Sequence, residues 1–108
     1  MDIEIGRIIE IGGVGHTIQF GPKVNAHLAA RSSLGEYEKA ASTIKVRSDM
    51  SPDQTMASIV HEAFHGVSVA YCAASLTEEE VSGMAQGATQ ILRQLGIRLI
   101  LPKVQEET

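Results

Sequence analysis

The stretch "SIVHEAFHGV", residues 58 to 67, contains three residues that can do chemistry together: His61, Glu62 and His65, in the pattern His-Glu-x-x-His. Residues four apart on a helix lie on one face, so the two imidazoles can bind one metal ion while the glutamate projects beside them. Zinc accepts such ligands and lowers the pKa of a bound water from about 16 to about 7. The pattern therefore predicts a zinc site, with Glu62 as the general base of peptide hydrolysis.

The segment that carries the motif is otherwise apolar. Between Gln54 and Leu76, the only other ionisable side chains are Tyr71 and Cys72. A buried carboxylate costs several kcal/mol unless something compensates it, so Glu62 in this setting favours a functional role. The alternative is that the motif lines a solvated helix edge and has no chemical role. The apolar stripe of the predicted helix consists of Met56, Ile59, Val60, Ala63, Phe64, Val67 and Ala70.

A zinc peptidase needs a third protein ligand. The extended pattern that supplies a third histidine is excluded, because Ser68 replaces its glycine and Tyr71 replaces its histidine. The glutamates that open the next helix are the other source. Glu78 falls on the predicted inward face, whereas Glu79 points more sideways and Glu80 completes a capping box. For the latter two, favourable negative charge at a helix N-terminus is a sufficient role. The predicted inward face consists of Val81, Met84, Ala85 and Ala88.

The first half of the chain alternates apolar and polar residues. Residues 3 to 11 and 14 to 20 each have one apolar side, and Gly12-Gly13 lies between them, which predicts a β-hairpin. Pro22 opens a short predicted helix, and "LGEYEKAAS", residues 34 to 42, is predicted to be a polar loop. Residues 43 to 47 form a third predicted strand, with Ile44 and Val46 inward.

The second half is predicted to be helical. Ser51 and Pro52 mark the start of a helix that extends to about Ala74. Thr77 to Glu80 is a capping box that opens a second helix, which Gly96 ends after about Leu95. The tail "KVQEET" after Pro102 is expected to fray.

Composition limits the classes of function. The chain has 108 residues, a length typical of a single domain spanning 1–108, and a net charge of −4 with no basic block. Nucleic-acid and anionic-membrane partners are therefore disfavoured. Cys72 is the single cysteine, and the N-terminus lacks the pattern of a secretion signal, so a reducing cytoplasm is expected. The polar motif at the centre of residues 56 to 76 argues against a membrane span.

Several other residues have two interpretations. His16 and His27 can in principle bind metal, but a core or surface role is favoured for both. Tyr37 and Tyr71 can polarise a substrate carbonyl or pack in the core, and packing is the default. Gly66, next to His65, is expected to allow another element to approach closely. Cys72 lies about 16 Å along the helix from His61, too far to share a metal, and is expected to be a buried thiol.

A family resemblance covers roughly residues 5 to 95. "GEYEKAASTIKVRSDMSPDQTMASIVHEAFHGV" followed by "LTEEEVSGMAQGATQIL" resembles the small phage and prophage zincins related to the ImmA/IrrE metallopeptidases. The resemblance implies a minimal zincin-like α+β fold, in which a small antiparallel or mixed sheet packs on the active-site helix and a second, C-terminal helix delivers a glutamate. It also implies a protein or peptide substrate, specifically a repressor or similar regulatory protein.

Carried onto this chain, the resemblance implies His61, His65 and Glu78 as ligands of Zn²⁺ and Glu62 as the general base. Ala63 stands where the family usually has leucine. Ser82 stands where larger relatives have asparagine, four residues after the ligand glutamate. Loss of a hydrogen bond to a ligand typically weakens metal affinity or activity by about 10- to 100-fold, so this departure bears on catalysis more than on zinc binding.

Two other classes of function remain alternatives. One is a non-catalytic zinc-binding protein-interaction module, which a cleavage assay would separate from an enzyme. The other is a helix-turn-helix DNA reader, suggested by two helices joined by a short link. The three glutamates that open the second helix disfavour it, because DNA phosphates would repel them.

Overall fold

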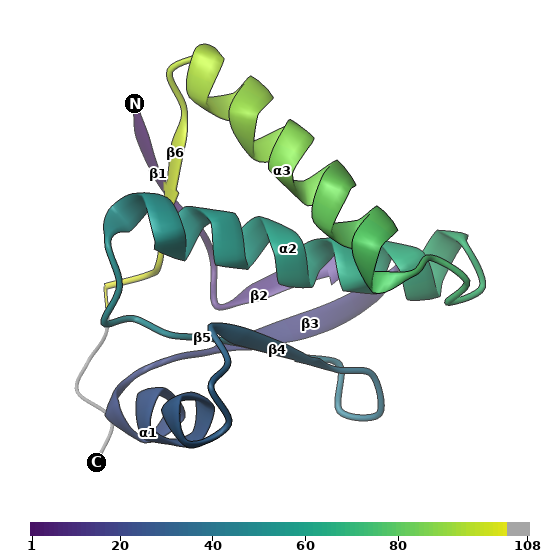
Figure 1. Ribbon diagram of the computed structural model, residues 1–108, viewed down its shortest axis with the longest axis horizontal. Coiled ribbons are helices and arrows are strands. Elements are labelled where there is room, and N and C mark those ends of the chain that lie inside the picture. Colours follow the sequence, from purple (N-terminus) through teal and green to yellow (C-terminus); the bar gives the residue numbers. More distant parts are fainter. Residues whose placement is uncertain (104–108) are drawn as a thin grey trace.

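The computed structural model describes residues 1–103, and its central element is a four-stranded mixed sheet with helices on both faces (Figure 1). The strand order is β2 (Ile8–Ile11), β3 (Val14–Gln19), β5 (Thr43–Val46) and β4 (Gly35–Glu38). β3 and β5 run parallel, whereas β2 and β4 are antiparallel to their neighbours. The predicted α+β class with a mixed sheet is therefore confirmed. The segment expected to fray lies outside the described residues from position 104 onward.

The N-terminal hairpin is shorter than predicted. β2 and β3 pair around Gly12 and Gly13, whose positive φ angles of 61° and 81° suit a tight hairpin turn. The expectation that residues from Ile3 onward belong to the same strand is wrong. β1 (Asp2–Glu4) instead pairs in parallel with β6 (Arg98–Ile100) in a separate two-stranded sheet. The pairing joins opposite ends of the chain, which local alternation does not reveal.

The loop predicted at residues 34 to 42 contains a strand, and this prediction was wrong. β4 forms the edge of the sheet and pairs with β5. Its glutamates are held by ion pairs: Oε1 of Glu38 lies 3.3 Å from Nζ of Lys45, and Oε2 of Glu36 lies 3.3 Å from Nε of Arg31. The strand therefore lacks the apolar alternation that usually signals one.

Two helices cover the two faces of the sheet (Figure 1). α1 (Pro22–Ala30) begins at the proline, as expected, and buries Leu28. α2 (Pro52–Tyr71) lies across the other face and carries the His-Glu-x-x-His motif. The core between α2 and the sheet contains Ile18, Phe20, Ile44, Val46 and Ile59.

Both long helices begin where predicted. The Ser51 hydroxyl accepts a hydrogen bond from the Gln54 amide at 3.2 Å, and Thr77 and Glu80 form a reciprocal capping box at the start of α3 (Glu78–Gln94). α2 ends at Tyr71, three residues before the predicted end. The connection from 72 to 77 is longer than the three to four residues typical of a helix-turn-helix. No helix within residues 1–103 is long and apolar enough to cross a membrane.

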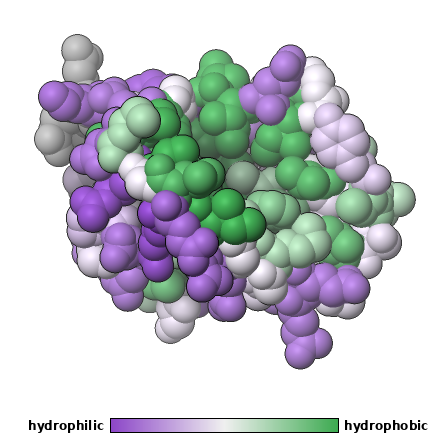
Figure 2. Space-filling model, turned by 90° about the horizontal axis from the view of Figure 1, so that it is seen from above, coloured by the Kyte–Doolittle hydropathy of each residue, from purple (hydrophilic) through white to green (hydrophobic). Residues whose placement is uncertain are grey.

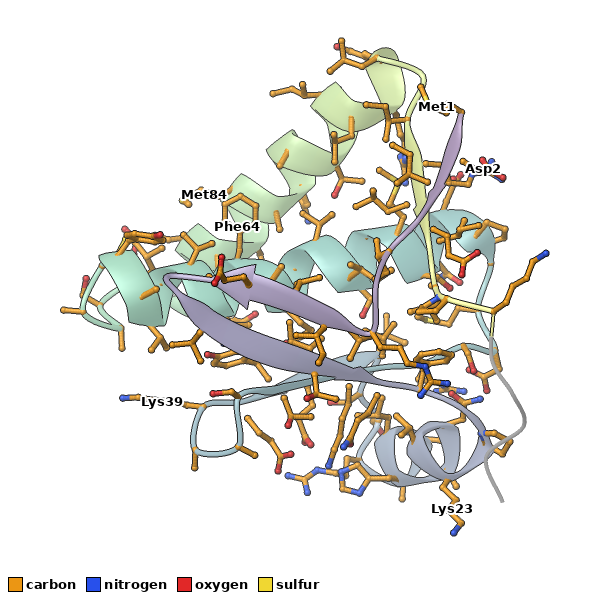
Figure 3. All side chains as sticks on the ribbon, turned by 180° about the vertical axis from the view of Figure 1, so that it is seen from behind. Met1, Asp2, Lys23, Lys39, Phe64 and Met84 are labelled. Atoms are coloured by element: carbon orange, nitrogen blue, oxygen red, sulfur yellow. The ribbon has the colours of Figure 1, made fainter. Side chains whose placement is uncertain are left out.

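The inward face of α3 differs from the prediction at Met84, which is exposed, at Ala88, which is half-buried, and at Thr89, which is buried. Val81, Ala85 and Thr89 are buried, whereas Met84 is 42% exposed and was wrongly placed inward. Figure 3 shows Met84 and Phe64 on the side of the molecule opposite to the view in Figure 1. Figure 2 views the molecule from above and shows apolar side chains gathered across the middle of that upper face. Because its buried residues are Val81, Ala85 and Thr89, α3 packs on the rest of the molecule through a narrow stripe of small residues.

Candidate metal centre

His61 and His65 project from one face of α2 and meet Glu78 in the first turn of α3. Nε2 of His61 lies 2.8 Å from Oε2 of Glu78, and Nε2 of His65 lies 3.1 Å from Oε1 of the same carboxylate. The ligating atoms of the three residues all lie within 4.8 Å of one another. The structure thus brings together two imidazoles one helical turn apart and a carboxylate from another helix.

The turn between α2 and α3 returns Glu78 to the two histidines. Ala73 and Ala74 adopt left-handed backbone conformations, with φ of 52° and 57°, and reverse the chain. Ser68 anchors the turn, because its backbone oxygen accepts from the Ala74 amide at 2.8 Å and its hydroxyl accepts from the Leu76 amide at 3.3 Å. α2 continues past the motif, and α3 runs back obliquely above it, rising away from α2 toward its C-terminal end (Figure 1).

Glu62 lies beside these residues and is buried, with 7% of its surface exposed. Burial, with smaller contributions from the negative charges of Glu78 and Glu36, raises the pKa of its carboxyl from 4.5 to about 7. A carboxylate with a pKa near neutrality is suited to take up and release a proton at physiological pH. The environment of Glu62 therefore matches the demands of a general base.

β4 covers Glu62 closely because residue 35 is glycine. A Cβ atom at position 35 would lie 2.6 Å from the Ser58 hydroxyl oxygen and 3.0 Å from Oε2 of Glu62. The Ser58 hydroxyl donates a hydrogen bond to the Leu34 carbonyl at 3.1 Å, which fixes the start of the strand against α2. The sequence pattern does not predict this contact, since it is typical of a loop around Gly35.

Gly35→Ala is expected to destabilise the protein by about 1–3 kcal/mol, because the new methyl group overlaps Ser58 and Glu62. The free energy of unfolding, measured with denaturant, tests this. Gly87→Ala in α3 is the matched control, since a Cβ at Gly87 meets no atom within 4 Å. That variant should be up to about 1 kcal/mol more stable than the parent. Equal stability of Gly35→Ala and the parent would contradict the close packing of β4 on Glu62.

The raised pKa of Glu62 predicts a pH-dependent effect on stability in metal-free protein. The folded state binds the proton of the Glu62 carboxyl more tightly than the unfolded state does. The stabilisation of the folded state by this proton is therefore complete below about pH 4.5 and is lost as pH rises through about 7. Glu62→Gln should therefore equal the parent in stability at pH 4 and exceed it at pH 8, by on the order of 3 kcal/mol. Thermal and denaturant unfolding at both pH values measure the difference. Glu79→Gln makes the same chemical change on the exposed first turn of α3 and is the control.

A cleft of about 920 Å³ opens over the metal centre. α2 supplies its floor, including the motif, and β4 with the loop before it supplies one wall. The other wall is α3, through Gln86, Gln90 and Arg93. The cleft is therefore long enough to extend well beyond the three converging side chains.

The other histidines lie outside the converging group. His16 on β3 is 4% exposed and occupies the core, as favoured from the sequence. Nε2 of His27 lies 3.2 Å from Oε1 of Glu36 at the surface of α1. Tyr71 is 71% exposed, so the expectation of core packing was wrong for this residue. Cys72 is half-buried rather than buried, because it caps the end of α2.

Gly66 allows β2 to approach α2 closely next to His65, and side chains of β3 and β4 lie at ordinary contact distance from the same position. A Cβ atom there would lie 2.9 Å from Cδ1 of Ile11, 3.5 Å from Cε1 of Tyr37 and 3.6 Å from Nε2 of His16. The predicted close approach is therefore confirmed, and its partner is β2. Neither the sequence pattern nor the helix geometry identified this partner.

Ser82 gives Glu78 no support through hydrogen bonding. Within residues 1–103, the side-chain hydrogen bonds at the start and along α3 are made by Thr77, Glu80 and Thr89. The Glu78 side chain is 65% exposed and meets the two histidines from the solvent side.

Comparisons with known protein families, curated proteins and solved structures find no match to this chain.

Proposed function

We propose that the chain is a zinc-dependent metallopeptidase with a minimal zincin-like architecture. The convergence of two imidazole Nε2 atoms on the two oxygens of Glu78, beside the buried carboxyl of Glu62, carries this proposal. His61, His65 and Glu78 would hold the metal, and Glu62 would act as the general base. One of the three proposed ligands, Glu78, comes from α3 rather than from α2. Chance placement of residues on one edge of α2 does not explain this convergence.

The residues present fit a zinc ion. Two histidines and one carboxylate are a donor set typical of catalytic zinc, with a fourth position left for water. Bonds of about 2.0–2.2 Å in a tetrahedron separate ligand atoms by about 3.3 Å. The observed contacts of 2.8 and 3.1 Å are close to this spacing, so a small outward shift of Glu78 would accommodate the ion.

The proposed chemistry is hydrolysis of a peptide bond by water. When bound, zinc supplies a Lewis acid that favours ionisation of water and polarises a carbonyl group. Glu62 takes the proton from the attacking water and delivers it to the departing amine. Its raised pKa, close to 7, suits both steps, because the carboxylate accepts the proton without retaining it.

The cleft supports an extended peptide as the substrate. β4 is an edge strand, so one side of its backbone has no strand partner, and residues 35 to 37 line the cleft. A peptide can add to such an edge through main-chain hydrogen bonds. The family resemblance makes a repressor or similar regulatory protein the candidate substrate, and a flexible segment of such a protein would fit this geometry.

Metal content tests the proposal. Purified protein reconstituted with zinc is expected to carry close to one equivalent, and His65→Ala should lose most of it, since one of three ligands is removed. Elemental analysis after desalting measures the ratio. His27→Ala is the control, because His27 pairs with Glu36 away from the centre and should not affect zinc. Absence of bound zinc in the reconstituted parent would end the peptidase proposal.

A non-catalytic zinc-binding module is the second candidate. The exposure of Glu78 and the lack of a hydrogen bond from Ser82 within the described residues favour it, because catalytic ligands are usually held by neighbouring groups. One equivalent of zinc without cleavage of any offered regulatory protein would support this alternative.

A further inference from the structure

Three aromatic rings form a stack that leads from the core to the metal centre. The ring of Tyr37 on β4 lies nearly parallel to that of His65, with centroids 6.2 Å apart and 20° between the planes. The Tyr37 ring also lies nearly parallel to that of His16, with a centroid distance of 5.7 Å and 25° between the planes. One proposed ligand is therefore connected to a buried histidine through a tyrosine.

The hydrogen bonds of His16 determine the direction of the Tyr37 hydroxyl. Nδ1 of His16 lies 2.9 Å from the Val14 carbonyl oxygen, which can only accept, so Nδ1 carries the hydrogen of the neutral ring. Nε2 is then an acceptor, and the Tyr37 hydroxyl donates to it at 3.1 Å. The hydroxyl proton is thus directed to His16 rather than to a substrate carbonyl.

His65 lacks the usual support of a metal-binding histidine. Such residues generally donate their second ring N–H to a carbonyl or carboxylate, which fixes the ring orientation. The hydrogen bonds among residues 1–103 include none to Nδ1 of His65. The neighbours that restrict rotation of this imidazole are therefore the rings of Tyr37 and His61, at centroid distances of 6.2 and 5.0 Å, and the Glu78 carboxylate.

Gly66 of α2 lies against the rings of Tyr37 and His16. Gly66 follows His65 directly, and a Cβ atom there would touch both Tyr37 and His16, at 3.5 and 3.6 Å. Glycine in a helix interior is unfavourable by up to about 1 kcal/mol relative to alanine. The contact that requires glycine is with Cδ1 of Ile11, 2.9 Å from such a Cβ, whereas the Tyr37 and His16 rings lie at ordinary contact distance from it.

We propose that Tyr37 and His16 are positioning residues for the metal centre: the Tyr37 ring packs on the imidazole of His65 and holds it toward the metal, and the hydrogen bond to His16 fixes that ring. This inference rests on the proposed zinc site. It assigns a role to the buried histidine of β3, which the hydrolytic steps do not use. It also explains why a tyrosine lies on the otherwise polar strand β4.

Zinc affinity and the visible absorption of the cobalt-substituted protein test the proposal, because Co²⁺ absorption depends on ligand geometry. Tyr37→Leu should weaken zinc binding by about 10- to 100-fold and alter the cobalt spectrum. Tyr37→Phe keeps the ring and loses only the hydrogen bond, so the loss should be smaller, about two- to tenfold. His16→Phe should resemble Tyr37→Phe, and the double variant should be no weaker than either, since both changes remove the same bond.

Phe20→Leu is the matched control. Phe20 is a buried aromatic residue of the same core that does not line the cleft, so its replacement should lower stability and leave zinc affinity and the cobalt spectrum unchanged. Parental affinity and spectrum in a folded Tyr37→Leu variant would overturn the positioning role. If that variant does not fold, Tyr37→Phe decides, and unchanged zinc affinity and cobalt absorption in it overturn the proposal. A parent that binds neither metal would overturn the zinc site as well, whereas a metal-binding parent matched by its variants overturns this inference alone.

Discussion

Glu62→Gln is expected to retain zinc and to lose peptide hydrolysis, by about 10²- to 10⁴-fold, the range typical of a positioned general base. The amide has nearly the shape of the carboxyl group, so it can occupy the buried site beneath Gly35 without overlap. It cannot accept a proton from water. Zinc content and the rate of cleavage of a regulatory protein, measured on the same preparation, separate the two effects.

Glu79→Gln is the control for Glu62→Gln, because it makes the same chemical change on an exposed residue of α3. It should match the parent in zinc content and in rate. Because the stability gain expected above pH 7 applies to the metal-free protein, unfolding curves of the zinc-loaded variant and parent show whether lost activity reflects unfolding. Equal cleavage by Glu62→Gln and the parent would remove Glu62 from the proposed mechanism.

Glu78→Ala is expected to reduce zinc affinity by more than about 100-fold, beyond the loss typical of residues that only orient a ligand. Its carboxylate contacts both imidazoles, at 2.8 and 3.1 Å, so its removal leaves two protein ligands. Competition with a chromophoric chelator measures the affinity. The exposure of Glu78 means that the substitution leaves no buried cavity, and the fold should be retained.

Glu79→Ala provides the comparison at the next position. It removes the same charge from the same helix turn, so any effect of α3 charge on zinc is matched. Its zinc affinity should stay close to that of the parent. A larger loss for Glu79→Ala than for Glu78→Ala would mean that α3 presents a different residue to the metal.

Local patterns predicted the helices well because their signals are local. The spacing of His61 and His65 follows from the period of a helix, and the capping serine and threonine bond to amides three residues away. The same reasoning failed for Met84, which is exposed. A single apolar side chain does not determine how a helix is rotated about its axis against its neighbour.

Strand β4 shows the limit of such patterns. An edge strand stabilised by ion pairs to α1 and β5 has no apolar period, so its four residues resemble a loop in sequence. β1 and β6 show the same limit at the chain ends, where strand pairing joins residues almost a hundred positions apart. Pairing partners of this kind depend on the whole fold.

The sequence by itself determined which residues could bind a metal and supply a base, since residue type and helical spacing are enough to place His61, Glu62 and His65 on α2. The tertiary structure alone decided how they are arranged with Glu78 and how deeply Glu62 is buried. The left-handed turn anchored by Ser68 returns Glu78 to the histidines, and the approach of Gly35 buries Glu62 and raises its pKa. Distance and burial depend on segments that are remote in sequence, whereas helical spacing depends only on neighbours along the chain.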